Sequence, residues 1–201
     1  MEKTFKSSGC ECQALYHRAP GVPLVFLHGL SFNIDVWQRI GVPELLVEKH
    51  IPFLAPDMPY GIKTNCHPKT RSPDKNVEFI ADAVHQAFGS AVPALVGASI
   101  GGHIALRYAT KYPVRGLLLV SPARSLADDL TESYSEFKFP VRVIWGSQDN
   151  IVSGEELRTL VDKIPGARLL VYEDATHASY LSQPSLFKRD LLEFYAVAEK
   201  P

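Results

Sequence analysis

The sequence predicts a three-layer α/β/α sandwich around an eight-stranded, mostly parallel β-sheet. A series of short, continuously apolar runs is typical of strands that are buried on both faces. Longer segments of helical periodicity separate these runs, and such alternation gives a parallel sheet with helices on both faces. The chain has 201 residues, which suits one domain, so we expect residues 1–201 to fold as a single domain.

Six of the apolar runs are predicted to be the parallel strands, because aliphatic and β-branched residues dominate them. Two further strands, Thr4–Ser8 and Gln13–His17, flank a Ser-Gly turn and are predicted to form an antiparallel hairpin at the edge of the sheet. The six parallel strands are expected at Leu24–Leu27, Ile51–Ala55, Ala91–Val96, Val114–Val120, Val141–Trp145 and Ala167–Tyr172.

The segments between the strands place apolar residues at helical spacing. Residues Val77, Ile80, Ala81 and Val84 show the i, i+3, i+4, i+7 pattern of an amphipathic helix. The helices are expected at Asp35–Val47, Asn76–Phe88, Ile100–Tyr112, Gly154–Lys163 and Pro184–Ala198.

Composition excludes several classes of function. The 21 Lys and Arg residues and 22 Asp and Glu residues give a net charge of −1, so no global field favours nucleic acid as a partner. No run approaches a membrane span, and the N-terminus lacks the apolar core of a signal peptide. Cys10, Cys12 and Cys66 are expected to be free thiols in a reducing cytoplasm, with a metal or disulfide role as the alternative.

A Gly-x-Ser-x-Gly pattern follows one of the predicted strands. The chain passes from this strand through Gly97 to Ser99, and the predicted helix begins directly after Ser99. A turn this sharp needs the flanking glycines, and it holds the serine hydroxyl above the sheet at a helix N-terminus. The pattern therefore indicates that Ser99 is a nucleophile.

A serine hydroxyl needs a base to remove its proton and an acid to orient that base. Asp149 and His177 each follow a predicted strand, and the chain order Ser, Asp, His is the one this turn requires. Because these loops open on the same edge of the sheet, we predict a triad of Ser99, His177 and Asp149. Asp174 is the alternative acid, but it must fold back within its own loop to reach His177.

Acyl transfer develops negative charge on a carbonyl oxygen, which fixed backbone N–H donors stabilise. One donor is expected at Ile100, the residue after the nucleophile. The other is expected at Leu30, in the loop that begins His28-Gly29. We expect His28 to brace this loop rather than to serve as a second base.

Together these motifs resemble those of the α/β-hydrolase fold family, over nearly the whole chain. The resemblance implies an α/β-hydrolase fold with Ser99 as nucleophile, His177 as base, Asp149 as orienting acid, and the N–H groups of Leu30 and Ile100 as oxyanion donors. Neither a metal ion nor an organic cofactor is implied. The motifs are His28-Gly29, Gly97-x-Ser99-x-Gly101, Gly146-x-x-Asp149 and Asp174-x-x-His177.

Two features depart from the family pattern. Only Ser121–Pro140 separates two of the predicted strands, which leaves room for one helix such as Ser125–Phe137 and for no separate lid domain. Where relatives often carry Asp-x-Pro-Gly-x-Gly, this chain has Tyr60 and Ile62 in place of the glycines, so that loop could reach over the pocket. A lidless pocket excludes little water and favours short acyl groups.

Loop position suggests which residues bound the pocket. His103, one turn after Ser99, lines the pocket, acts as a second proton carrier or packs under the sheet, and packing is the favoured interpretation. The basic cluster Lys63, His67, Lys69, Arg71 and Lys75 is expected to be a solvated loop, with recognition of an anionic substrate such as a phosphate-bearing thioester as the alternative. The expected wall residues are Ser31, Phe32, Asn33, Trp37, Tyr60, Ile100, Leu126 and Val152.

The sequence thus predicts a serine hydrolase that cleaves small carboxylic esters or related acyl derivatives through an acyl-Ser99 intermediate. It resembles small lidless hydrolases that include carboxylesterases and acyl-lysine deacylases. Acyl transfer, thioester cleavage and amide deacylation use the same triad and remain alternatives, because a fold does not fix a function. A non-catalytic binding protein with a hydrolase shell is the alternative from another class. The expected partner is a small acyl substrate, and the oligomeric state is left open.

Overall fold

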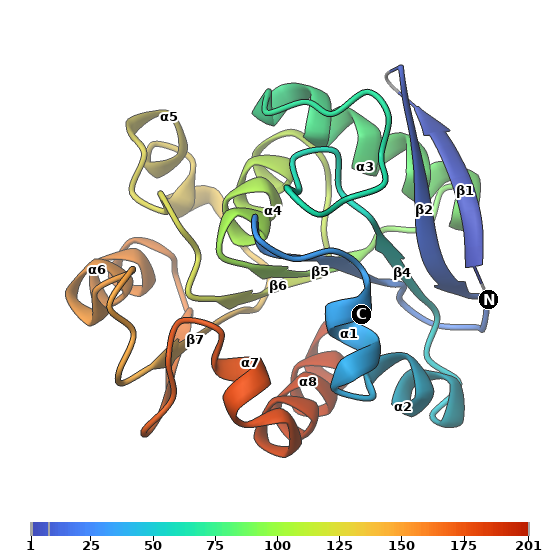
Figure 1. Cartoon of the computed structure of the whole chain (residues 1–201). Helices are drawn as coiled ribbons and strands as arrows, with labels where there is room; N and C mark the ends of the chain where they lie inside the picture. The colour runs from blue at the N-terminus through green and yellow to red at the C-terminus, as the bar shows by residue number, and fades with distance from the viewer. Residues whose placement is uncertain (1, 8, 201) are drawn as a thin grey trace.

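Eight strands form one sheet with helices on both of its faces (Figure 1). The computed structural model describes residues 2–7 and 9–200, so Ser8, the last residue of the first predicted strand, lies outside the described residues. The strands are β1 (Glu2–Ser7), β2 (Cys10–His17), β3 (Leu24–Leu27), β4 (Phe53–Pro56), β5 (Ala94–Ala98), β6 (Gly116–Val120), β7 (Val141–Gly146) and β8 (Arg168–Tyr172).

The strand order is β1-β2-β4-β3-β5-β6-β7-β8. Strand β2 pairs antiparallel with both β1 and β4, whereas the strands β3 to β8 pair in parallel with one another. The mostly parallel sheet and its edge hairpin are therefore confirmed. Because six strands run the same way, their carboxyl ends share one edge of the sheet, where the loops that carry chemistry emerge.

Two layers of helix sandwich the sheet. Helices α3, α4 and α6 lie on one face, and α1, α2, α7 and α8 lie on the other (Figure 1). None of the described helices is both long and apolar enough to cross a membrane. The helices are α1 (Asp35–Arg39), α2 (Val42–Glu48), α3 (Pro73–Phe88), α4 (Ile100–Lys111), α5 (Asp128–Thr131), α6 (Gly154–Lys163), α7 (Ser179–Ser182) and α8 (Pro184–Ala198), with a 3₁₀ turn at Tyr134–Glu136.

Strand side chains alternate between two apolar cores. In β6, Leu117 and Leu119 join the core under α3 and α4, while Leu118 and Val120 join the core under α8. All four side chains are at most 1% exposed. This explains the continuously apolar sequence of the strand, because both faces of a central parallel strand are covered by helices.

Two helices take the place of the predicted Asp35–Val47 helix. The chain breaks after α1 because Gly41 has a φ of 68°, in the left-handed region that glycine adopts without strain. Pro43 then sits in the first turn of α2, where its missing N–H costs no hydrogen bond.

A proline also shifts the start of one strand to a later residue. Pairing of β5 begins at Ala94 rather than Ala91, because Pro93 has no N–H to donate, and it extends through Gly97 to Ala98.

The segment between β6 and β7 contains only short helical turns. A helix over Ser125–Phe137 was predicted, whereas the structure has the four-residue α5 and the 3₁₀ turn. The fully buried Tyr134 donates its hydroxyl hydrogen bond to the carbonyl oxygen of Ser125, which folds the segment back on itself. Within the described chain, this insertion adds no separate lid domain.

The cysteine prediction is wrong in one respect. Cys12 in β2 and Cys66 in the loop after β4 form a disulfide, and Cys10 alone is a free thiol. The expectation of a reducing compartment rested on three free thiols, so this bond removes its support. The sequence does not reveal the pair because 54 residues separate the two cysteines, and an antiparallel bridge between their neighbours Glu11 and His67 brings them together.

We expect the double variant Cys12→Ser, Cys66→Ser to lose up to about 4 kcal/mol of unfolding free energy, since the bond closes a long loop of the unfolded chain. Urea denaturation of oxidised wild type and variant measures the difference, with Cys10→Ser as the matched control. Alkylation of the denatured protein before and after reduction counts the free thiols. Three alkylated cysteines without reduction would contradict the disulfide.

Candidate active site

Ser99 sits in a strained turn between β5 and α4. Its φ of 53° and ψ of −117° lie in a region that a residue with a side chain rarely adopts. The turn is held by hydrogen bonds on both sides: the Ser99 N–H donates to the carbonyl oxygen of Val120 at 2.9 Å, and the Ser99 carbonyl accepts from the N–H of Ala123 at 3.1 Å. Such strain persists only where the surrounding structure enforces it, and it is typical of functional sites.

Two glycines leave room for this turn. A Cβ atom at Gly97 would lie 2.5 Å from the carbonyl oxygen of Gly101, and one at Gly101 would collide with the backbone of Leu27 in β3. Helix α4 therefore approaches the sheet backbone more closely than any side chain allows. The Gly-x-Ser-x-Gly spacing is a packing requirement here.

His177 and Asp149 meet at the carboxyl edge of the sheet. The imidazole Nδ1 of His177 lies 2.9 Å from Oδ2 of Asp149, whose side chain is fully buried, while the His177 side chain is 19% exposed. The other carboxylate oxygen, Oδ1, accepts the N–H groups of Ile151 at 2.8 Å and Val152 at 3.1 Å. Both carboxylate oxygens of Asp149, in the loop after β7, therefore face hydrogen-bond donors.

Burial alone would raise the pKa of Asp149, but hydrogen bonds from the Ile151 N–H, from His177 and from the Val152 N–H outweigh it and hold this pKa below its ordinary value. Asp149 is therefore ionised at neutral pH. An ionised carboxylate orients the imidazole and keeps its Nδ1 protonated.

Asp174, the alternative acid, is directed elsewhere. It is exposed and accepts a hydrogen bond at Oδ1 from Nε2 of Gln148 at 3.3 Å, while its N–H donates to the hydroxyl of Ser147. The geometry favours Asp149 as the partner of His177. Between Ser99 and His177 the described structure has no hydrogen bond, an arrangement that unliganded active sites often show.

The two predicted oxyanion residues flank Ser99. Ile100 is the first residue of α4, and Leu30 lies in the turn after β3, where its side chain is 37% exposed. Among the described residues, neither backbone N–H donates to another group of the protein. A Cβ built on Gly29 would lie 3.7 Å from the Cβ of Ser99, so this turn passes close to the predicted nucleophile.

The loop that follows β4 clamps the turn that contains Leu30. The N–H of Ile62 donates to the carbonyl oxygen of Leu30 at 2.8 Å, and the hydroxyl of Tyr60 donates to the carbonyl oxygen of His28 at 2.5 Å. Burial raises the pKa of Tyr60 well above its ordinary value, so it remains a neutral donor. This loop therefore fixes the position of the turn that contains Leu30.

His28 braces the same clamp from beneath. Its Nε2 accepts the N–H of Met58 at 2.9 Å and lies 3.3 Å from Oδ1 of Asp57, and its ring is fully buried. Burial would raise the pKa of Asp57, but its contact with the His28 ring and the hydrogen bond from the Asn65 N–H hold it below its ordinary value. A ring enclosed in this way supports the loop and is closed to substrate.

A pocket of about 320 Å³ opens beside Ser99. Its wall combines the predicted nucleophile and both predicted oxyanion residues with apolar side chains, two arginines and a buried amide. The lining residues are Leu30, Tyr60, Arg71, Pro73, Asn76, Ser99, Ile100, His103, Ile104, Ala123 and Arg124.

This arrangement matches a known family. A model of the alpha/beta hydrolase family matches residues 24–142, which is more than half of the chain. The chain belongs to the alpha/beta hydrolase family.

The chain is also similar to curated α/β hydrolases. It is 26% identical over 178 residues to Protein ABHD14A of Danio rerio, covering 87% of this chain but only 64% of that protein. It is 26% identical over 194 residues to the "Putative protein-lysine deacylase ABHD14B" of Homo sapiens, covering 90% of each.

Solved structures agree on the fold. A "predicted CIB-like hydrolase" from Thermoplasma acidophilum superimposes with a TM-score of 0.86 at 24% identity, over 96% of both chains. An esterase from Exiguobacterium antarcticum superimposes with a TM-score of 0.83 at 17% identity, over 98% of this chain and all of that one.

Of the expected wall residues, Tyr60 and Ile100 line the pocket of this α/β hydrolase, and the others do not. Trp37 is fully buried, with its ring stacked on Tyr180 and Phe187 in the core under α8. Val152 is also buried and contributes its backbone to the Asp149 loop. Ser31, Phe32 and Asn33 lie outside the lining because the pocket opens toward α3 rather than toward α1. Leu126 packs instead against the core under α3 and α4.

Several lining residues were not predicted as wall residues, among them His103, Arg124 and Asn76. His103 borders the pocket although it is buried, and Arg124 and Asn76 carried no signal in the sequence. The Asn76 amide nitrogen donates to two carbonyl oxygens, at 2.7 and 3.1 Å, which leaves its buried Oδ1 without a partner. The sequence predicts that Asn76 begins a helix, but no sequence pattern indicates that this helix borders the site.

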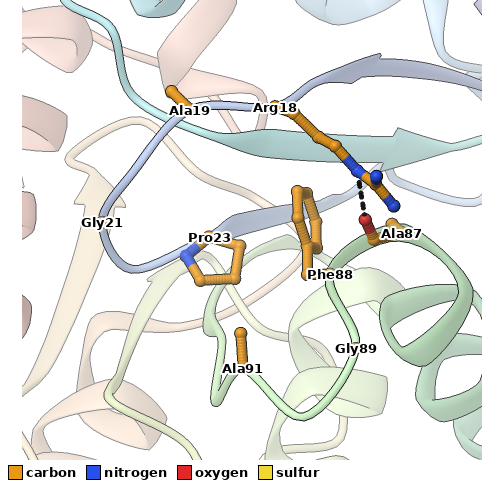
Figure 2. A pocket seen from close by; sticks show the side chains of 8 residues that line it. All are labelled: Arg18, Ala19, Gly21, Pro23, Ala87, Phe88, Gly89 and Ala91. Carbon is orange, nitrogen blue, oxygen red and sulfur yellow. Dashed lines mark hydrogen bonds between the residues drawn. The ribbon is translucent and has the colours of Figure 1, made fainter.

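A larger hollow, of about 520 Å³, lies at the opposite end of the sheet. Figure 2 shows that the segments leading into β3 and β5, with Pro23 and Ala91, form its walls together with the end of α3. Arg18 donates from Nε to the carbonyl oxygen of Ala87 there. Its position at the amino ends of the strands separates it from Ser99.

We expect Gly101→Ala to destabilise the protein by about 1–3 kcal/mol, because the new methyl group meets the Leu27 backbone. In an unconstrained helix the same change is stabilising, so the sign of the effect tests the close approach. Urea denaturation measures it. Gly29→Ala is the matched control, since its methyl group would lie 3.4 Å from the nearest atom, in ordinary contact. Equal unfolding free energies for the two variants would rule out the constraint.

Proposed function

We propose that the chain is a serine hydrolase that cleaves small carboxylic esters or related acyl derivatives through an acyl-Ser99 intermediate. The hydrogen bond between His177 and the buried, ionised Asp149 carries this proposal. A paired imidazole and carboxylate at the edge where Ser99 is held in a strained turn is the arrangement that nucleophilic catalysis requires.

In the first step, Nε2 of His177 accepts the proton of the Ser99 hydroxyl as Oγ bonds to the carbonyl carbon of the substrate. The charge that develops on the carbonyl oxygen is stabilised by the N–H groups of Leu30 and Ile100. The imidazolium of His177 then donates its proton to the departing alcohol as the carbon–oxygen bond breaks. Water repeats the sequence on the acyl-serine and releases the carboxylic acid.

Asp149 acts through His177 rather than on the substrate. It accepts the Nδ1 hydrogen of His177, which leaves Nε2 free for the proton of Ser99, and its negative charge stabilises the imidazolium that forms. The N–H groups of Ile151 and Val152 fix the carboxylate in place.

The covalent step is shared by several reactions. Amide deacylation, thioester cleavage and acyl transfer differ in the group that leaves or arrives, and a relative that carries the name of a lysine deacylase supports the removal of acyl groups in general. A binding protein with a hydrolase shell would lack the activated serine. Covalent labelling separates that alternative from all the enzymatic ones.

Wild-type protein should form a single adduct with a fluorophosphonate, seen by intact mass, because only Ser99 is activated. Ser99→Ala should not label, and Ser90→Ala, at an exposed serine far from the site, should label as wild type does. The absence of an adduct on folded wild type would favour the binding-protein alternative.

We expect Ser99→Ala and His177→Ala each to lower kcat for a short ester by roughly 10³-fold or more, and the double variant to lose little further, because a triad acts as a unit. Steady-state kinetics on purified, folded variants tests this. Additive losses in the double variant would show that the two residues do not act together.

Among p-nitrophenyl esters, we expect kcat/KM to be highest for acyl chains shorter than about ten carbons. A pocket of about 320 Å³ without a lid offers a long chain little apolar contact. A chain-length series from acetate to laurate measures the preference. A maximum at ten carbons or more would contradict a shallow, open pocket.

A further inference from the structure

Two arginines from distant parts of the chain meet at the pocket that Ser99 lines. Arg71 precedes α3, and Arg124 lies in the loop after β6. Both residues are exposed, and neither forms an ion pair with any residue in the described part of the chain. An unpaired guanidinium group beside a nucleophile is available to a ligand.

The rest of the pocket wall leaves these charges uncompensated. The lining contains no Asp or Glu residue. His103 is neutral, because its Nε2 accepts a hydrogen bond from Nε of Arg107 at 3.0 Å, and burial together with the Arg107 charge lowers its pKa. Arg107 itself is paired with Asp129. The pocket therefore presents two positive charges and no negative charge of its own.

Arg124 is held in place by the site itself. Its φ of 54° lies in the left-handed region, and its carbonyl oxygen accepts a hydrogen bond from Nδ1 of the buried His103 at 3.3 Å. The residue before it, Ala123, donates its N–H to the carbonyl oxygen of Ser99 at 3.1 Å. The backbone of Arg124 is therefore strained, and its neighbour Ala123 is hydrogen-bonded to the backbone of Ser99. Together these features fix the backbone of Arg124 relative to Ser99.

Arg71 is anchored from the other side of the pocket. The N–H of Thr70 donates to the carbonyl oxygen of Pro59, next to Tyr60, and the Thr70 carbonyl oxygen accepts from the buried Asn76 amide at 3.1 Å. Within the basic cluster that the sequence singled out, Arg71 alone lines the pocket. Lys69 instead donates to the carbonyl oxygen of Ile62.

We propose that the substrate of this site carries an anionic group, a carboxylate or phosphate, which Arg71 and Arg124 bind beside Ser99. The inference rests on the proposed serine hydrolase function and specifies its substrate class. Planar guanidinium groups bind such oxyanions through paired N–H donors. The anion belongs to the acyl chain or to the leaving group, and two pairs of esters separate these sources.

For the acyl side, p-nitrophenyl hemiadipate is compared with p-nitrophenyl hexanoate. For the leaving-group side, 4-carboxyphenyl hexanoate is compared with 4-carbamoylphenyl hexanoate. Within each pair, the readout is the ratio of kcat/KM for the charged ester to that for the neutral ester. Comparing this ratio between variants cancels the intrinsic reactivities of the esters.

We expect the double variant Arg71→Gln, Arg124→Gln to lower this ratio by about tenfold for one of the two pairs. Rising ionic strength should lower the wild-type ratio in the same pair, because salt screens exposed charges. Lys63→Gln is the matched control: it removes one exposed positive charge from the same basic cluster without touching the pocket, and its ratio should equal that of wild type. Thermal melting checks that each variant is folded.

The proposal of an anionic substrate would be overturned if, for both pairs, the ratio were the same in wild type and in the double variant. If the neutral esters are still turned over, the proposed serine hydrolase function stands. An equal fall in Lys63→Gln would overturn it too, because the effect would then come from general surface charge. If wild-type protein neither reacts with the fluorophosphonate nor hydrolyses any ester, the proposed function fails. The anion site is then tested by itself, through calorimetric measurement of ligand binding. Binding of adipate but not of 1,6-hexanediol, lost in the double variant, would support it; no adipate binding would overturn it.

Discussion

The close approach of α4 to the sheet is the constraint on which the site depends. Gly97 and Gly101 let the helix pack against the backbone of β3, and the chain can reach the helix from β5 only through the strained turn at Ser99. The same turn places the first N–H of α4 at Ile100 and directs the Ser99 carbonyl toward Ala123. One packing contact therefore positions the candidate nucleophile, a candidate oxyanion donor and the loop that carries Arg124.

The second half of the site is held by a chain of contacts across loops. The loop after β4 bonds to the backbone of both His28 and Leu30, through Tyr60 and Ile62. Farther along, Cys66 ties that loop to β2, and Thr70 bonds back to it beside Arg71. Because the loop is fixed at several points, it can serve as one rigid wall of the pocket without a lid domain.

The positions of candidate residues that lie just beyond the end of a strand could be predicted from the sequence. Ser99, Asp149 and His177 each lie in the turn or loop that follows an apolar strand, and parallel strands bring their carboxyl ends to one edge of the sheet. The Asp149–His177 contact agrees with that reasoning, while Asp174 turned to Gln148. Trp37 was misplaced because loop position says which end of the sheet a residue occupies, but not toward which face its side chain packs.

The strand–helix alternation, the sharp turn at Ser99 and the order of the three candidate catalytic residues can be predicted from the sequence, because each depends on local pattern and on the direction of parallel strands. Contacts between distant segments bring Cys12 to Cys66 and place Arg71 and Arg124 in one pocket wall with His103. The two cysteines, and likewise the two arginines, lie more than fifty residues apart in the chain, and their positions depend on the bridge between Glu11 and His67 and on how α3 packs beside α4. No local pattern encodes such distances.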